Sequence, residues 1–239
     1  MSKILIVIPH EDDELAVAGQ LIISLKVYQV NKIYVIYTTN GDSYSLDGQI
    51  RNMEATKDLK ILGVDEDNII FLGYGNEWKE KHLYNCSGEQ TICSKAGKEE
   101  TYGIEGHEEY IYYKKGKHNK YTRNNFKNDL IMAITDIMPD LLISVDYDSH
   151  PDHRATSLFV EECIGEILNK KPEYYPTVWK KFAYLGAWNG PKDYYYHKIT
   201  LNSKEDKDTT DNPAISWKSR IRLEVPAECK TLKLRKNIL

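Results

Sequence analysis

The sequence lacks the excess of basic residues that nucleic-acid-binding proteins carry. Its 32 Lys and Arg residues are outnumbered by 36 Asp and Glu residues, and the formal net charge is −4. A protein that binds nucleic acid usually presents a strongly basic face that offsets the phosphate charge. We therefore expect no nucleic-acid partner.

Long hydrophobic runs are also missing. The apolar run at 4–9, which precedes His10, has only six residues. This is too short for the core of a signal peptide or for a membrane span. We expect a cytoplasmic protein without a membrane-spanning segment.

Cysteine is scarce and irregularly spaced. The cysteines are Cys86, Cys93, Cys163 and Cys229. This pattern encodes neither a disulfide framework nor a Cys-x-x-Cys zinc site. Cys86 and Cys93 are near enough in sequence to pair in principle, but reduced thiols are the expectation for a cytosolic chain.

The sequence does contain the composition and rhythm of a folded α/β protein. Hydrophobic residues make up 41% and charged residues 28% of 239 residues, which suits one sizeable core, and we predict a single domain over 1–239. A continuous aliphatic run at 4–8 predicts a strand buried on both faces. Apolar residues at helical spacing over 15–29 and a strand pattern at 33–38 complete a βαβ unit.

The same alternation continues along the chain. It predicts a doubly wound, mostly parallel, Rossmann-like sheet with right-handed connections. The further elements expected are a helix at 49–62 closed by Gly63, a strand at 69–72, a helix at 124–138 that stops before Pro139, and a strand at 141–145.

Two stretches interrupt this alternation. Residues 73–121 are rich in Gly, Lys, Glu and Tyr without clear periodicity, and we expect an insertion or loop near the substrate. Residues 182–225 are expected to form an appended C-terminal β element, and 230–239 have the pattern of a helix start. The strands expected in the β element are 182–185, 194–201 and 221–225.

Polar residues follow two of the predicted strands. Ligands of open α/β sheets bind beyond the carboxyl ends of the strands, so we expect the loop after 4–8 and the loop after 141–145 to meet. Hydrolytic zinc sites take three His or carboxylate ligands and leave a position for water. His10, Asp13 and His153 supply such a set.

Neighbouring residues are suited to the other steps of amide hydrolysis. Asp12, adjacent to Asp13, is the predicted general base that takes a proton from the metal-bound water. His150 is the predicted acid or oxyanion partner. A negative Asp152 beside it would raise the pKa of its imidazole.

These motifs resemble those of a known family. Pro-His-x-Asp-Asp-Glu after the first strand and His-Pro-Asp-His after a later one are similar to motifs of the PIG-L/LmbE family of N-acetylglucosaminyl deacetylases. The resemblance covers most of residues 1–160 and implies zinc-dependent removal of an acetyl group from an amino sugar. The family roles carried to this chain are zinc ligands at His10, Asp13 and His153, a general base at Asp12, and an oxyanion or leaving-group partner at His150.

A further match and two departures concern the substrate. Arg51 and Glu54 resemble the Arg-x-x-Glu helix of the family, which implies that they bind the substrate. Glu11 stands where the family commonly has proline. The family tyrosine near the second motif has no certain counterpart, since Tyr147 is merely nearby, and this leaves the oxyanion partner less completely assigned.

Each motif also has a structural alternative. The carboxylates of 11–14 would complement the positive N-terminus of the first helix, and His-Pro-Asp-His would form a turn in which Asp152 caps the next helix. Arg51 and Glu54 would form a surface ion pair. The two motifs occur together at the ends of two strands of one sheet, and this favours the metal site. The metal ligands, the general base and the acid or oxyanion partner of a zinc hydrolase are then all supplied in one place.

Other imidazoles and tyrosines are less specific. His107, His118 and His197 are expected to be exposed or locally hydrogen-bonded. The tyrosines of the insertion either pack in the ordinary way or stack on sugar faces. They are Tyr102, Tyr110, Tyr112 and Tyr113.

The sequence thus favours a metal-dependent hydrolase that removes the N-acetyl group from an N-acetylglucosamine-type sugar or glycoconjugate. The expected cofactor is Zn²⁺, and Fe²⁺ is another divalent metal that such ligands accept. The expected partner is a small-molecule amino-sugar conjugate or glycan precursor. Two alternatives are a hydrolase of another amide or a phosphoester that uses the same metal site, and a degenerate sugar-binding module.

Overall fold

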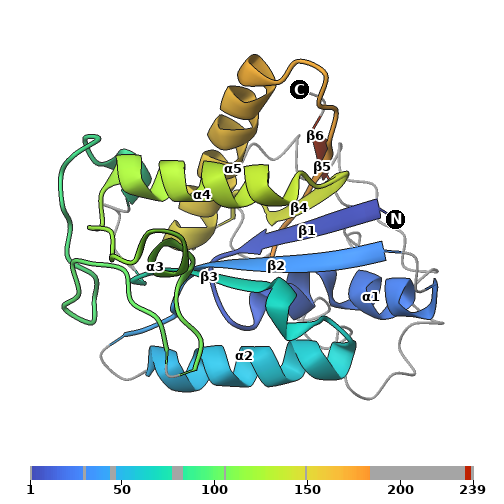
Figure 1. Cartoon of the computed structure of the whole chain (residues 1–239), viewed down its shortest axis with the longest axis horizontal. Helices are drawn as coiled ribbons and strands as arrows, with labels where there is room; N and C mark the ends of the chain where they lie inside the picture. The colour runs from blue at the N-terminus through green and yellow to red at the C-terminus, as the bar shows by residue number, and fades with distance from the viewer. Residues whose placement is uncertain are drawn as a thin grey trace, which may run out of the picture.

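A computed structural model describes residues 2–28, 31–43, 47–76, 83–104, 106–148, 150–183 and 235–237 (Figure 1). The strands are β1 (Ser2–Ile8), β2 (Asn31–Thr39), β3 (Ile69–Tyr74), β4 (Leu141–Val145), β5 (Thr177–Lys181) and β6 (Arg235–Asn237). The helices are α1 (Asp13–Tyr28), α2 (Gly48–Leu62), α3 (Tyr110–Lys115), α4 (Arg123–Ile137) and α5 (Pro151–Lys170), with short 3-10 turns at Glu66–Asn68 and Leu83–Asn85.

The described strands form one sheet in the order β3-β2-β1-β4-β5-β6. Neighbours among β1 to β5 pair in parallel, whereas β6 is antiparallel to β5. The chain adds strands on one side of β1 and then returns to add β4 and β5 on the other. The predicted doubly wound, mostly parallel sheet is confirmed, and its topological switch point lies between β1 and β4.

Helices cover both faces of the sheet. Helices α1 and α2 lie on one face, and α4 and α5 lie on the other (Figure 1). Successive residues of β1 point to opposite faces, so Leu5 joins the core with α4 and α5 while Ile6 joins the core with α1 and α2. Both are fully buried, and each such side chain contributes roughly 1.5–3 kcal/mol. Burial on both faces is why β1 is continuously aliphatic.

The helix ends agree with the sequence to within one or two residues. Helix α2 begins where Asp47 accepts the Gln49 backbone N–H at 2.8 Å, and it ends at Gly63, whose φ of 88° is the predicted left-handed cap. Helix α4 ends one residue before the prediction, because Met138 has φ of 49° and caps the helix. Pro139 then follows outside the helix, as expected of a residue that cannot continue it.

The segment 73–121 is folded wherever the structure describes it. Strand β3 extends to Tyr74, and helix α3 forms from a stretch in which the sequence predicted no helix. Tyr121 is buried and its carbonyl accepts the Ile92 backbone N–H at 3.0 Å. The Tyr74 hydroxyl donates to Asp129 of α4 at 2.7 Å. These residues are therefore folded although their sequence lacks periodicity, because buried aromatic side chains pack the segment against α4, and its role as an insertion or loop near the substrate stays a prediction.

The C-terminal predictions are tested only in part. Strand β5 precedes the predicted strand 182–185, and Phe182 and Ala183 lie outside a strand. The predicted strands 194–201 and 221–225 lie outside the described residues. The prediction of a helix start at 230–239 is wrong at β6, because its backbone pairs with β5. The single domain over 1–239 and the β element at 182–225 stay predictions.

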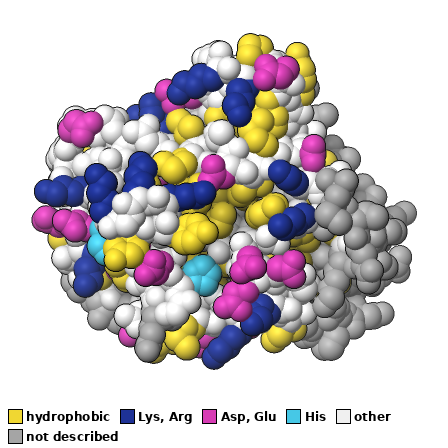
Figure 2. All heavy atoms as spheres, viewed as in Figure 1, with side chains coloured by type: hydrophobic (Ala, Val, Ile, Leu, Met, Phe, Trp, Pro, Cys, Tyr) yellow, Lys and Arg dark blue, Asp and Glu magenta, His cyan; other side chains and the backbone are white. Residues whose placement is uncertain are grey.

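The face of the molecule seen in Figure 2 carries charges of both signs. Lys and Arg side chains lie over the part of the face that α3 and α4 occupy, with Asp and Glu between them (Figure 2). Lys114 and Asp136, for example, form an ion pair of 2.6 Å. No helix in the described ranges is both long and apolar enough to cross a bilayer. The cytoplasmic location stays a prediction.

Candidate active site

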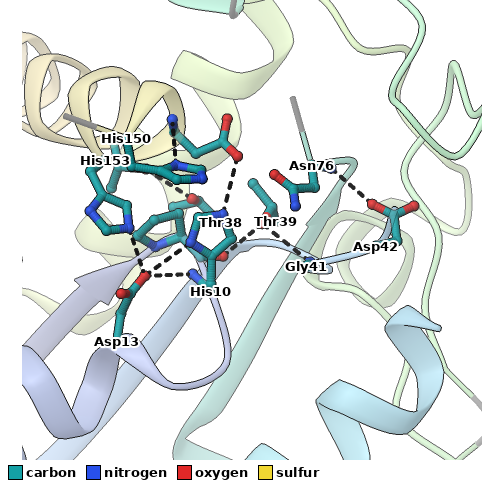
Figure 3. A network of polar contacts seen from close by, with 12 residues as sticks. His10, Asp13, Thr38, Thr39, Gly41, Asp42, Asn76, His150 and His153 are labelled. Carbon is teal, nitrogen blue, oxygen red and sulfur yellow. Dashed lines mark hydrogen bonds and ion pairs between the residues drawn. The ribbon is translucent and has the colours of Figure 1, made fainter. Parts of the chain in front are cut away.

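The two predicted loops meet beside the switch point. Strand β1 leads to His10, and β4 leads to His150 and His153 at the start of α5. The ring of His10 lies 4.6 Å from that of His150 and 5.3 Å from that of His153, measured between centroids. The three imidazoles are buried and each offers a nitrogen within 4.8 Å of the others. Figure 3 shows the rings gathered above Asp13.

Asp13 joins two of these imidazoles. Its Oδ2 lies 3.1 Å from Nδ1 of His10 and 3.2 Å from Nε2 of His153. Burial alone would raise the pKa of Asp13, but the charge and hydrogen bonds of the two imidazoles lower it well below its ordinary value. Burial alone would lower the pKa of His153, but Asp13 and Asp148 raise it to about 9. This geometry stabilises positive charge at the centre of the cluster.

The residues fit a divalent metal ion. The two imidazoles and one carboxylate of His10, His153 and Asp13 are the donor types that hydrolytic zinc sites use. The carboxylate that stabilises two protonated imidazoles would equally offset the charge of a cation held between them. His150 lies in the same cluster, so a further nitrogen adjoins the predicted ligands.

Local structure explains why the first loop holds this shape. The His10 backbone N–H donates to Oδ2 of Asp13 at 3.2 Å, and Asp13 is the first residue of α1. Thr39, at the end of β2, donates its hydroxyl to the Pro9 carbonyl at 2.7 Å. Asp13 therefore complements the positive N-terminus of α1 and also faces the histidines, so the two interpretations of this residue are compatible.

Asp148 is a site residue that the sequence reasoning missed. Its Oδ2 accepts a hydrogen bond from Nδ1 of His153 at 2.8 Å, and its Oδ1 accepts the backbone N–H of His150 at 2.9 Å. The side chains of His153 and Asp148 are both fully buried. A carboxylate behind one imidazole nitrogen fixes the tautomer and turns the other nitrogen toward the centre. The sequence does not predict this contact, because Asp148 lies before the His-Pro-Asp-His motif and belongs to no recognisable pattern of its own.

The structure corrects the expected link between Asp152 and His150. The Asp152 carboxylate lies 3.1 Å from Nε2 of His10, while the Asp152 backbone N–H donates to Nδ1 of His150 at 3.2 Å. His150, rather than Asp152, is the N-cap residue of α5. Burial, followed by the charges of His10 and His153, lowers the pKa of His150 to about 3. The charge of Asp152 acts to raise the pKa of His150, as expected, but burial and the charges of the two other imidazoles outweigh it, so the expected net rise does not occur.

Arg51 lies at the edge of the first loop. It contacts Glu11 at 3.2 Å and Asp12 at 3.6 Å, so in the described residues its ion pairs are with the acidic loop and not with Glu54, which is exposed. Burial raises the pKa of Glu11 to about 7 against the opposing charge of Arg51. The Asp12 side chain keeps 39% of its surface exposed. Of the two predicted substrate-binding residues, Arg51 borders the site.

Residues of the 73–121 insertion adjoin the same edge of the sheet. The Tyr102 hydroxyl donates to Oδ2 of Asp42 at 2.7 Å, and the Asn76 backbone N–H donates to Oδ1 of Asp42 at 2.8 Å. A cavity of about 20 Å³, room for roughly one water molecule, is lined by residues of β2, the insertion, α4 and α5, among them Tyr121 and Asp152.

The remaining tyrosines and histidines are mostly engaged locally. Tyr110 is buried and donates to Asp136, Tyr112 stacks on His118, and His118 pairs with Glu109. Tyr113 is exposed. The expectation of an exposed or locally bonded imidazole is confirmed for His118. His107 is half-buried and its ring meets that of Phe71 edge-on, and His197 lies outside the described residues.

Fold and site together define an α/β protein with a buried histidine-carboxylate centre at the switch point of its sheet. The model of the PIG-L family, described as GlcNAc-PI de-N-acetylase, matches residues 5–164. The chain belongs to this family. No curated protein sequence matches the chain.

Several solved structures are similar to this chain. A deacetylase of teicoplanin biosynthesis is 14% identical with a TM-score of 0.52, and the match covers 93% of this chain and 86% of that one. The N,N'-diacetylchitobiose deacetylase of Pyrococcus horikoshii is 19% identical with a TM-score of 0.49, over 78% of this chain and 62% of that one. The 4-carboxy-2-hydroxymuconate hydratase of Pseudomonas putida is 16% identical with a TM-score of 0.42, over 75% and 65%. The chain thus spans less than two thirds of the Pyrococcus and Pseudomonas proteins.

Proposed function

We propose that the protein is a metal-dependent N-deacetylase that releases acetate from an N-acetylglucosamine-type sugar or glycoconjugate. The observation that carries the proposal is the convergence of His10, Asp13, His150 and His153 at the switch point of the sheet, with Asp12 next to Asp13 in the chain. Membership of the PIG-L family supports it.

The metal site would consist of His10, Asp13 and His153. We propose Zn²⁺ as the ion, with Fe²⁺ as the other candidate for these ligands. When bound, such an ion polarises the acetyl carbonyl and makes water a stronger acid. Asp148 would keep the unprotonated nitrogen of His153 turned toward the ion, since Asp148 binds the other nitrogen of that imidazole.

The residues of the chain would divide the remaining chemistry. Asp12 is a carboxylate with an accessible surface, so it is suited to take a proton from the attacking water. His150 accepts a backbone hydrogen bond at Nδ1, which leaves Nε2–H to donate to the oxyanion of the tetrahedral intermediate. Asp152 would orient His10, whose Nε2 it contacts.

The substrate would lie between the first loop and the insertion. We propose Arg51 as a substrate contact because it borders Asp12, and Glu54 stays a proposal that rests on the family pattern. Residues 73–121 would form the other wall, since Tyr102 meets Asp42 at this edge.

The test is product analysis with Zn²⁺-loaded protein. N-acetylglucosamine, one of its glycosides, an N-acetylated dipeptide and an aryl phosphate are incubated separately, and acetate, free amine and phosphate are measured. The proposal predicts acetate and amine in equal amounts from the sugars alone. Release from the dipeptide or phosphate ester instead would establish the other hydrolase, and sugar binding without any turnover would establish a binding module.

A further inference from the structure

The protein itself holds the guanidinium of Arg51 on three sides. Nε lies 3.2 Å from Oε2 of Glu11, Nη1 donates to the Gly41 carbonyl at 2.9 Å, and Nη2 lies 3.6 Å from Oδ1 of Asp12. The Arg51 side chain keeps 20% of its surface exposed. A ligand that reached this guanidinium would therefore meet it together with its carboxylate partners.

The backbone at Gly41 makes room for this arrangement. Gly41 has φ of +58°, and a Cβ there would overlap Oε2 of Glu11 and lie 2.7 Å from Nη1 of Arg51. Any other residue would displace one of the two side chains. The Glu11 side chain is 1% exposed and neither of its carboxylate oxygens has a hydrogen bond. Among the charges that favour its ionised form, that of Arg51 has the largest effect and that of His10 comes next.

The charges around Arg51 decide which ligand it accepts. A guanidinium without acidic neighbours binds phosphate or sulfate through paired N–H groups. Here the carboxyl groups of Glu11 and Asp12 both face one cation, so Arg51 would attract an incoming anion less strongly than a guanidinium without acidic neighbours. A sugar hydroxyl is compatible with both signs, because it accepts from Arg51 and donates to Asp12.

We infer that Glu11 is a specificity-determining residue that makes the site select an uncharged, hydroxyl-bearing group at Arg51 and reject an anionic one. The inference rests on the proposed function, since it narrows the amino-sugar substrate to one that is neutral where it meets Arg51. Glu11 acts through Arg51. The position is also where the chain departs from the proline of the family pattern.

Sulfate binding to the Zn²⁺-loaded protein tests the inference without turnover. The Kd is measured by calorimetry at pH 8 and constant ionic strength. Glu11→Gln keeps the shape of the side chain and removes its charge, so we expect sulfate to bind at least about tenfold more tightly than to the wild type. Adding Arg51→Gln should abolish the gain. Asp58→Asn removes a charge from an exposed position of the same helix and should leave the Kd unchanged.

Two results would overturn the inference. One is an unchanged sulfate Kd in Glu11→Gln, and the other is a gain that survives the addition of Arg51→Gln. If Glu11→Gln fails to fold, the single variant Arg51→Gln provides the test. We expect its sulfate Kd to differ from that of the wild type by less than about twofold. A large loss of sulfate affinity would show that Arg51 already binds anions in the wild type. A protein that binds sulfate as expected but releases no acetate would refute the proposed function and leave this inference intact.

Discussion

Two adjacent carboxylates of the first loop, Asp12 and Asp13, differ in burial and in their contacts, and therefore in the role to which each is suited. Asp13 is buried between two imidazoles, which hold its pKa well below the ordinary value. Asp12 keeps 39% of its side chain exposed and faces Arg51. Asp13 is therefore suited to bind a cation and Asp12 to exchange a proton.

Asp12→Asn tests this division directly. Loss of the general base should lower kcat by roughly 10²–10⁴-fold, while the metal content should stay at the wild-type value because Asp13 is untouched. Acetate release and metal analysis on the same preparation check both halves. Full activity in this variant would remove Asp12 from the mechanism.

Asp148→Asn tests the carboxylate that orients His153. Without the negative partner at Nδ1, the affinity for Zn²⁺ should fall about 10–100-fold, as measured by competition with a chelator. Asp146→Asn is the matched control, because Asp146 is equally buried in this loop and its carboxylate accepts the Tyr147 backbone N–H. Equal losses in the two variants would show a general disturbance of the loop.

At the scale of the elements, helices α4 and α5 are joined by charge as well as by packing. Arg123 of α4 donates to Glu162 of α5 at 2.5 Å and 3.3 Å. Burial alone would raise the pKa of Glu162, but the hydrogen bond and charge of Arg123 lower it below its ordinary value of 4.5. A lowered pKa means that the pair stabilises the fold when Glu162 is ionised.

Glu162→Gln should therefore destabilise the protein in a pH-dependent way. The loss should be about 1 kcal/mol or less, as for partly exposed pairs, and constant from pH 7 down to about the ordinary pKa of glutamate. Below that pH the wild type becomes protonated and the difference should shrink. Thermal unfolding of both proteins between pH 7 and 3.5 measures it, and a difference that grows toward low pH would contradict the sign.

A second contact between elements anchors the insertion. The Asn119 side-chain amide donates to both carboxylate oxygens of Asp129, each at 2.9 Å. Asn119→Ala should cost about 1–3 kcal/mol in the free energy of unfolding, because it leaves a buried carboxylate with fewer donors. Urea unfolding checks this, with the exposed Asn128→Ala on α4 as control, and equal losses in both variants would argue against an anchor.

The sequence predicted regular elements better than irregular ones, for physical reasons. Aliphatic runs and a glycine cap are local signals, so β1, β4 and the end of α2 at Gly63 were predicted correctly. Helix α3 and the buried Tyr121 depend on contacts with α4 that leave no periodicity in the segment. Asp148 and the partners of Arg51 likewise arise only when distant segments meet.

At the scale of the whole molecule, the topology brings the site together. Parallel strands β1 and β4 are neighbours, so the residues after their carboxyl ends meet although a long stretch of chain separates them. His10, Asp13 and His153 were predicted to converge by this rule, and the structure brings them together. Their role as metal ligands is the central claim.

Metal analysis of the purified protein and of Asp13→Ala tests that claim most directly. Both are loaded with Zn²⁺, dialysed to remove loosely bound ions, and measured by mass spectrometry together with protein concentration. The account predicts about one ion per wild-type chain and a loss of most of it in the variant, because the carboxylate between two imidazoles is gone. Equal metal content in the two proteins, or a wild type that stays free of metal, would contradict it.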